Sequence, residues 1–485
     1  MDDRIGSIIK SIEEKPFYQY LLLAVIVLLS VVLRFYKLGD WSFWIDEIYT
    51  INHATRHFGS LELIFNHIPP VGRWIPLSVI LTAQAMNTWG VNEWSARFIS
   101  ATIGVLSLPI LYVPLRKAFD NWVALIALLI LAVSTWHIFW SQNARFYTSL
   151  LLFYSLTLFA FYFAIEHDRP LFLIGFYALF YLALSERMIA VLIWPVIIVY
   201  LLSVWLLPFA KPAGLRPRNL LILAAPLIAF LAYEIYLFVT TGDFIFATDL
   251  DLLAPPIDTP IRLLSLSVFS IGIPVVCLAA FSGIYLYLEK KRSGLFFLIS
   301  AMLPLLLIAM ANPFVFTVER YAFMTLLFWV ALAANGITAI FALARRHQTV
   351  LAIGVLFLLL ADAAGSNLMY FQINHGDRLA WREAAEYVNT KMQPGDVIVS
   401  TRAPLASYYL GQDTLEFQDL LAADLEEIDA PLWFIVDFPG IWHGKDESRA
   451  WMEEHAQLMQ FSYLRVREYN YLLIYFFDPA QADVP

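Results

Sequence analysis

Long apolar runs separated by short polar segments make up most of the chain from position 1 to position 370, out of 485 residues in total. A helix that crosses a bilayer needs about 20 mostly apolar residues. The first run has the length of a span and lacks the small-residue cleavage site of a signal peptide, so it predicts a retained helix. We predict eleven spanning helices, near residues 18–36, 95–115, 122–141, 146–165, 170–184, 187–207, 219–240, 262–288, 294–311, 321–343 and 348–368.

The segment 74–89 is a further apolar stretch that is short and partly polar, so it either spans or lies flat on the membrane. The positive-inside rule decides between these options, because cytoplasmic loops carry an excess of Lys and Arg. With a cytoplasmic N-terminus and an interfacial 74–89, the outer short loops hold few basic residues. The basic residues of the cytoplasmic loops are then Arg116, Lys117, Arg169, Lys211, Arg216, Arg218, Lys290, Lys291, Arg292, Arg345 and Arg346. This favours a juxtamembrane helix at 74–89, a first outer loop at 37–94 and an outer C-terminal tail.

The pattern changes sharply after residue 370. A helical pattern opens at Trp381, and the Pro394-Gly395-Asp396 triplet predicts a turn. Apolar runs at 397–399, 432–437 and 461–477 predict three or four short strands. Strands that alternate with helical patterns indicate an α/β domain. We therefore predict a transmembrane domain over 1–370 and a small extracytoplasmic α/β domain over 371–485.

The composition supports a membrane protein and excludes several other classes. Hydrophobic residues make up 60% of the chain and charged residues 15%, whereas soluble domains carry about 25% charged residues. The formal net charge is −9, without the basic patch that nucleic-acid binding requires. Cys277 is the single cysteine, so neither an internal disulfide nor a cysteine-based zinc site stabilises the fold.

Two adjacent carboxylates, Asp46 and Glu47, follow an aromatic segment directly after the first predicted span. A solvated acidic loop is the plainer interpretation of such a pair. The position at the membrane surface favours catalysis, because a lipid-linked donor would present its reactive head group there. An acceptor hydroxyl that attacks a sugar must lose its proton, and a carboxylate within hydrogen-bond reach can take it. The departing phosphate needs cationic partners rather than a strong acid.

Candidate cations lie on the same predicted side, at Arg145, Arg187 and Arg320. Each one taken alone is equally consistent with a snorkelling residue at a helix end. Three arginines at one depth, on a face that is otherwise poor in basic residues, indicate a site that binds an anionic lipid head group. Tyr147 and Tyr321 accompany two of them and are further candidates for donor binding.

His67 precedes a turn formed by Pro69 and Pro70. It is a candidate phosphate donor or proton relay, with a simple turn residue as the alternative. His53 and His57 lie in the same loop, but the spacing of these histidines and the two carboxylates matches no compact metal motif, so we assign no metal ligands.

The chain resembles the GT-C superfamily of integral-membrane glycosyltransferases. It is most similar to the branch of dolichyl-phosphate-mannose protein mannosyltransferases and the lipid A aminoarabinose transferase. The resemblance extends from the N-terminus to about position 170, and later spans match only in topology. The residues that carry it are Trp44-Ile45-Asp46-Glu47, Pro69-Pro70, Glu93-Trp94-Ser95-Ala96-Arg97 leading into Leu108-Pro109-Ile110-Leu111-Tyr112, and Trp140-Ser141-Gln142-Asn143-Ala144-Arg145-Phe146-Tyr147.

This resemblance implies an inverting transfer from a polyprenyl-phosphate-linked sugar, with Asp46 as the catalytic carboxylate and Glu47 in support. It also implies that Arg145 faces the active site and binds the carrier phosphate. Two departures from the family pattern concern the site: Ile68 separates His67 from the two prolines, and Asn143 stands where an acidic residue is usual. An amide cannot pair with Arg145 as a carboxylate would.

A lipid or sugar transporter and a membrane-anchored scaffold are the alternative classes. Transporters commonly show inverted repeats and mid-membrane charges, and the chain shows no repeat and few mid-span charges. The sequence leaves open the sugar, whether hexose or pentose, and the acceptor, whether lipid, glycan or protein. The resemblance leaves open a divalent metal, since some relatives need one. We expect a prokaryotic plasma membrane, with an endoplasmic reticulum membrane as the alternative.

Overall fold

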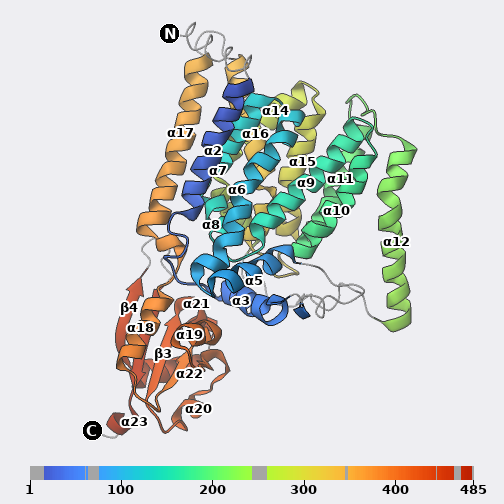
Figure 1. Ribbon diagram of the computed structural model, residues 1–485. Helices are drawn as coiled ribbons and strands as arrows, with labels where there is room; N and C mark the ends of the chain where they lie inside the picture. The colour runs from blue at the N-terminus through green and yellow to red at the C-terminus, as the bar shows by residue number, and fades with distance from the viewer. Residues whose placement is uncertain are drawn as a thin grey trace. The chain divides into compact units, whose positions relative to one another are not determined.

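The computed structural model describes residues 16–60, 62–63, 76–242, 259–343, 348–443, 445–463 and 471–482 (Figure 1). The chain forms two compact units, and each is described by itself. The bundle unit comprises Met1–Tyr36, Ser60–Leu81 and Ile99–Gly365. The loop–tail unit comprises Lys37–Gly59, Thr82–Phe98 and Ser366–Pro485, so segments of the first predicted outer loop pack with the C-terminal tail.

Long apolar helices form the bundle unit, as the sequence predicts. Eight helices of the described chain are long and apolar enough to cross a membrane. A helix that is apolar all round is stable only when lipid or other helices cover its surface. The helices of this class are α2 (Pro16–Phe35), α6 (Glu93–Ala118), α9 (Tyr147–Glu166), η1 with α11 (Met188–Leu192 and Ile193–Leu206), α12 (Pro217–Thr241), α15 (Arg292–Ala311), η3 with α16 (Glu319–Thr325 and Leu326–Leu343) and α17 (Gln348–Leu368), which continues into η4 (Met369–Ile373).

Among the described helices, two predicted spans are broken. The helix α7 (Asn121–Val133) meets α8 (Thr135–Ser141) at 62°, where Ser134 caps the second helix. The helix α13 (Pro260–Ile271) meets α14 (Ile273–Leu288) at 94°, across Gly272 with φ 102°. These pairs and the shorter α10 (Leu171–Glu186) fall on the remaining predicted segments. The count of eleven spans stays a prediction.

The segment 74–89 contains a helix, α5 (Leu77–Trp89), of 13 residues. At about 1.5 Å of rise per residue it is too short to cross about 30 Å of hydrocarbon. It is absent from the candidate spans of the described chain. Its predicted place in the membrane interface is not tested by this observation.

The tail folds into a five-stranded sheet with helices, which confirms the predicted α/β character. The strand order is β2-β1-β3-β5-β4, with β1 parallel to β2 and β3, and β5 antiparallel to β3 and β4. The buried side chains of Val399, Phe434 and Trp451 belong to its core. The strand β2 has only two residues and was not predicted from the sequence. The elements are η5 (His375–Asp377), α18 (Trp381–Lys391), β1 (Val397–Ser400), α19 (Ala403–Leu410), β2 (Leu415–Glu416), η6 (Phe417–Asp419), α20 (Ala422–Glu426), β3 (Leu432–Asp437), α21 (Phe438–His443), α22 (Asp446–His455), β4 (Gln457–Tyr463), β5 (Tyr471–Phe477) and α23 (Pro479–Ala482).

Candidate active site

Glu47 and Arg97 form a buried ion pair in the loop–tail unit. Both side chains are almost fully buried, with exposed fractions of 0% and 1%. The Arg97 guanidinium donates to Glu47 from Nε at 2.8 Å and from Nη2 at 2.9 Å. It also donates to the backbone carbonyls of Leu38, Trp41 and Ser42, at 3.2, 2.9 and 2.9 Å. Because a guanidinium has five N–H donors, these five bonds use its full capacity and fix the path of residues 38–47.

The loop shape set by Arg97 places Asp46 in the first turn of α3 (Ile45–Phe58). The backbone N–H of Trp44 donates to Oε2 of Glu47 at 3.3 Å, which satisfies one of the free donors at the helix start. Asp46 is half-buried, whereas Glu47 is buried. The positive end of the helix dipole stabilises carboxylates in this turn. Of the two adjacent carboxylates, Glu47 is therefore a structural anion, and Asp46 is the one with solvent access.

Two side chains from the tail, Arg378 and Tyr409, contact this loop and were not predicted from the sequence. Arg378 places Nε 3.7 Å from Oε2 of Glu47. The hydroxyl of Tyr409 accepts from the backbone N–H of Phe43 at 2.6 Å and donates to Glu93 at 2.8 Å. Burial raises the pKa of this tyrosine hydroxyl, so it stays protonated. Tyr409 lies 366 positions after Phe43 and 316 positions after Glu93 in the sequence, and no local pattern could have predicted these contacts.

In the bundle unit, two of the predicted phosphate-binding arginines lie on one aromatic ring. The guanidinium carbons of Arg145 and Arg187 lie 5.1 and 5.5 Å from the ring centroid of Phe146. Cation–π attraction of this kind holds a guanidinium in place without using its N–H donors. The ring therefore brings together two positive charges from separate segments of the chain, one before α9 and one after α10.

The turn that carries Arg145 is fixed by its neighbours. The Gln142 side-chain amide donates to the backbone carbonyls of Arg34 and Tyr36 at 3.0 and 2.8 Å, and so caps the end of α2. The Asn143 amide donates to the carbonyl of Phe139 at 2.5 Å. An ionised carboxylate has no N–H and could not make this bond. The departure from the family pattern at Asn143 therefore has a structural use.

The segment that carries Arg187 is fixed by the preceding residue. Glu186 is buried and accepts from the backbone N–H of Ser78 at 3.0 Å and from the Ser78 hydroxyl. Ser78 lies in the first turn of α5, so a carboxylate from α10 satisfies the free donors of that helix start. Arg187 itself is exposed just beyond this contact.

Aromatic contacts join Tyr147 to the η3 segment, which carries Arg320 and Tyr321. Tyr147 is 2% exposed, and its ring centroid lies 3.9 Å from that of Trp140. Arg320 and Tyr321 are half-buried at the start of η3. Phe323 of the same element has its ring centroid 6.4 Å from that of Tyr147. The structure therefore brings the η3 segment next to the helix that begins at Tyr147.

His67, Pro69 and Pro70 lie outside the described residues. For a divalent metal, no group of three or more His, Cys, Asp or Glu residues in the described part of the chain could hold the ion. Both Glu47 oxygens already accept hydrogen bonds from Arg97. The described donor set therefore does not fit a metal bound between Asp46 and Glu47.

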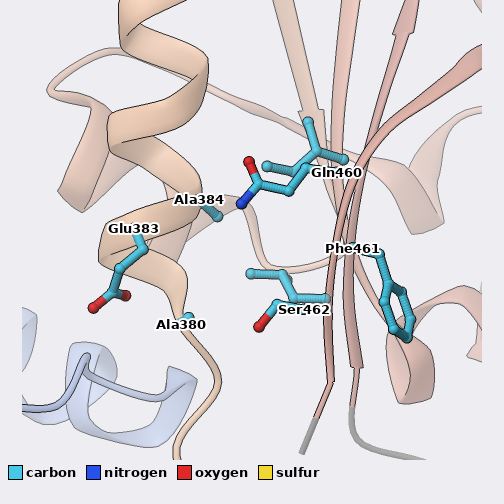
Figure 2. A pocket seen from close by; sticks show the side chains of 8 residues that line it. Ala380, Glu383, Ala384, Gln460, Phe461 and Ser462 are labelled. Carbon is cyan, nitrogen blue, oxygen red and sulfur yellow. The ribbon is translucent and has the colours of Figure 1, made fainter.

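A small pocket lies between α18 and β4 in the tail (Figure 2). Its volume is about 200 Å³, and Glu383, Gln460 and Ser462 contribute its polar side chains. Ligand pockets usually measure about 300–1,000 Å³. The pocket is too small for a lipid-linked sugar, and we do not assign the donor site to it.

Comparisons with known proteins agree with the overall fold. Residues 67–230 match the family model of the dolichyl-phosphate-mannose-protein mannosyltransferases. ArnT from Cupriavidus metallidurans, solved with bound undecaprenyl phosphate, is similar over 95% of this chain and 99% of its own, with 12% identity and a TM-score of 0.59. The Archaeoglobus fulgidus oligosaccharyltransferase is similar over 92% of this chain and 74% of its own, with 11% identity and a TM-score of 0.59. No curated protein sequence matches the chain significantly.

The chain is a multi-pass membrane protein with the fold of the GT-C glycosyltransferases. Within this class, the matched segment confirms the resemblance to the dolichyl-phosphate-mannose-protein mannosyltransferase family. At identities this low, the solved structures establish the fold and leave substrates and residue roles to be argued from the site.

Proposed function

We propose that the protein is an inverting glycosyltransferase that moves a sugar from a polyprenyl-phosphate carrier to an acceptor hydroxyl, with Asp46 as the base. The observation that carries the proposal is the difference in burial and hydrogen bonding between the two adjacent carboxylates. Glu47 is held by two Arg97 bonds and is 0% exposed, whereas Asp46 beside it is half-buried. This difference supports Asp46 as the group that exchanges a proton with a substrate.

One carboxylate base, together with cationic side chains that bind the carrier phosphate, suffices for this reaction. Asp46 takes the proton of the acceptor hydroxyl as its oxygen bonds to the anomeric carbon. The bond from that carbon to the phosphate oxygen breaks, and its electron pair leaves with the carrier phosphate. Attack from the side opposite the phosphate inverts the anomeric centre. A carrier phosphate is a good leaving group when cations stabilise its charge.

Arg145 and Arg187 are the proposed phosphate ligands. Both guanidinium carbons lie within 5.5 Å of the Phe146 ring centroid, and two positive charges beside one ring suit a phosphate. Arg320, Tyr147 and Tyr321 are proposed to bind the donor from the neighbouring segments, and His67 to contribute from the first loop. Guanidinium–phosphate bonds are charge-assisted and contribute about 1.5–3 kcal/mol each.

The solved relatives support the choice of donor and acceptor class. ArnT was solved with undecaprenyl phosphate, and the Archaeoglobus fulgidus oligosaccharyltransferase with a dolichol-phosphate and an inhibitory peptide. We propose a polyprenyl-phosphate-linked hexose or pentose as the donor and a lipid, glycan or protein hydroxyl as the acceptor. The distribution of basic loops supports an active site and tail on the outer face of a prokaryotic plasma membrane.

The test is transfer by purified protein in lipid nanodiscs. Undecaprenyl- and dolichyl-phosphate sugars are supplied with membrane extract, and glycosylated products are identified by mass. Asp46→Asn keeps the size of the side chain and removes the base, so kcat should fall by about 10²–10⁴-fold.

The matched control is Asp40→Asn, an exposed carboxylate in the same loop, which should keep wild-type kcat. Full activity of the Asp46 variant would remove that residue from the mechanism. Absence of transfer by the wild type with every donor would refute the glycosyltransferase assignment.

A further inference from the structure

The turn that joins α17 to the tail domain has an unusual backbone. His375, Gly376 and Asp377 are consecutive, and their φ angles are 48°, 66° and 54°. L-residues other than glycine rarely adopt this left-handed region. Such conformations are unfavourable in themselves and persist where the surrounding structure enforces them. Arg378 follows directly, so the strained turn determines where its side chain goes.

The same turn packs closely against the first loop within the loop–tail unit. A Cβ atom on Gly376 would overlap the ring of Trp41, so only glycine fits at this approach. The Trp41 ring lies 5.4 Å from the Tyr370 ring and 6.0 Å from the Phe371 ring, centroid to centroid. The tail therefore packs against the first loop through residues that immediately precede Arg378.

Arg378 contacts the residues on both sides of Asp46. Its side chain is 4% exposed, and its Nε lies 3.7 Å from Oε2 of Glu47. Its guanidinium carbon lies 5.7 Å from the ring centroid of Trp44. Nη1 donates to the carbonyl of Gly376 at 3.4 Å, which ties the side chain back to its own turn. The Arg378 side chain thus contacts both Glu47, which follows Asp46, and Trp44, which lies two positions before it.

We propose that Arg378 is a positioning residue, supplied by the tail, that fixes the direction of Asp46 by holding Glu47 and Trp44. It acts through these two neighbours rather than on the reacting atoms. This role rests on the proposed function only in that Asp46 is the group being positioned. The tail is then a component of the catalytic loop, and the strained turn is the structural cost of that arrangement.

The first test measures loop order and does not depend on any substrate. Hydrogen exchange of the peptides covering residues 40–50 is compared between wild type, Arg378→Gln and Arg449→Gln in nanodiscs. Arg449 pairs with exposed Asp446 on α22 and is the matched control. Exchange in the loop should be at least several-fold faster in Arg378→Gln and unchanged in the control. Equal exchange in all three proteins would overturn the proposal, whatever the enzyme transfers.

The second test separates positioning from binding. With a donor that the wild type accepts, Arg378→Gln should lower kcat by about 10–100-fold, because small misplacement of a catalytic group has effects of this size. The donor KM should stay within about twofold. Arg378→Lys, which keeps the charge and loses the planar fork, should recover part of kcat. A raised donor KM with unchanged kcat would mean that Arg378 binds substrate directly and would overturn the positioning role.

Gly376→Ala provides an independent variant, should Arg378→Gln fail to fold. Its added methyl group displaces Trp41 or the turn while Arg378 itself is retained. Faster exchange in residues 40–50 and a lower kcat should again appear together. A fully active Gly376→Ala protein with an ordered loop would show that the turn does not position Asp46. In either case, transfer by the wild type shows separately whether the proposed function holds.

Discussion

In the described part of the chain, Arg97 of the loop–tail unit and Arg34 of the bundle unit are both fully buried, and their partners differ. Arg97 is paired with the Glu47 carboxylate and three loop carbonyls. Arg34 donates to the carbonyls of Leu131 and Ala132 at 3.2 and 3.0 Å, and its Nη2 lies 2.7 Å from Nδ1 of His137. No acidic residue among those that the structure describes forms an ion pair with Arg34.

The difference shows two uses of a buried guanidinium. The Leu131 and Ala132 carbonyls lie at the end of α7, where that helix breaks before α8, so Arg34 supplies hydrogen-bond donors to carbonyls at the break. Arg97 instead neutralises a buried charge and shapes an irregular loop. Unpaired buried charge is more expensive than unpaired buried carbonyl. The two sites should therefore respond differently to substitution, and four variants test this, ordered by expected effect.

Arg97→Gln should destabilise most. It removes one partner of a buried ion pair, which costs about 3–5 kcal/mol, and three carbonyls lose their donor. The free energy of unfolding, measured by SDS titration in mixed micelles, should fall by this amount, with loss of transfer activity. A loss under about 1 kcal/mol, the range of an exposed pair, would show that the pair contributes little.

Glu47→Gln should cost less, about 3 kcal/mol. The amide oxygen still accepts one bond from Arg97, and Arg97 keeps its three carbonyls. Arg97 and Arg378 then lack their shared anion. The same titration gives the value, and a larger loss than for Arg97→Gln would mean that repulsion between the two arginines dominates the site.

Arg34→Met should cost about 1–3 kcal/mol, the range for buried carbonyls that lose a donor. Methionine replaces most of the side-chain volume without adding a charge. Because Gln142 binds the Arg34 backbone carbonyl, the turn that carries Arg145 keeps one anchor, and donor KM should rise less than twofold. A loss above about 4 kcal/mol would place Arg34 in the same class as Arg97.

Arg449→Gln should have the smallest effect, under about 0.5 kcal/mol, because an ion pair with a solvent-exposed partner contributes little. Its partner Asp446 has a side chain that is 91% exposed. This variant sets the baseline for the other three. A change above about 1 kcal/mol would indicate that the assay reports more than local contacts.

The sequence predicts the positions of the long helices well, because an apolar run of about 20 residues is a strong signal. The sequence pattern does not predict the two helix breaks, at Ser134 and at Gly272. Gly272 and the following Pro274 are a local signal for the 94° break, hidden in an otherwise apolar run. The break at Ser134 has no glycine or proline. Its stabilising partner, Arg34, lies 97 and 98 positions before the two carbonyls that it binds, so local pattern could not reveal it.

The candidate site likewise combines features that local sequence predicts with contacts between distant segments that it does not. Asp46 and Glu47 look equivalent in sequence, and only the fold separates them, because the partners of Glu47 come from α6 and from the tail. The sequence groups Arg145, Arg187 and Arg320 as candidate cations at one depth, and the structure places the first two beside the Phe146 ring. The partnership between Glu186 and Ser78 depends on two helices meeting, which no local pattern encodes.

The final strand of the tail, β5, lies inside the sheet between β3 and β4 rather than at its edge. The sheet therefore cannot close until the ribosome has made the chain up to Phe477. The first loop ends near position 94, so during synthesis it is made long before the tail residues that pack against it. Premature termination upstream of β5 should thus yield a chain whose tail sheet and first loop stay incompletely ordered, so the contacts between loop and tail form only after β5 has been made.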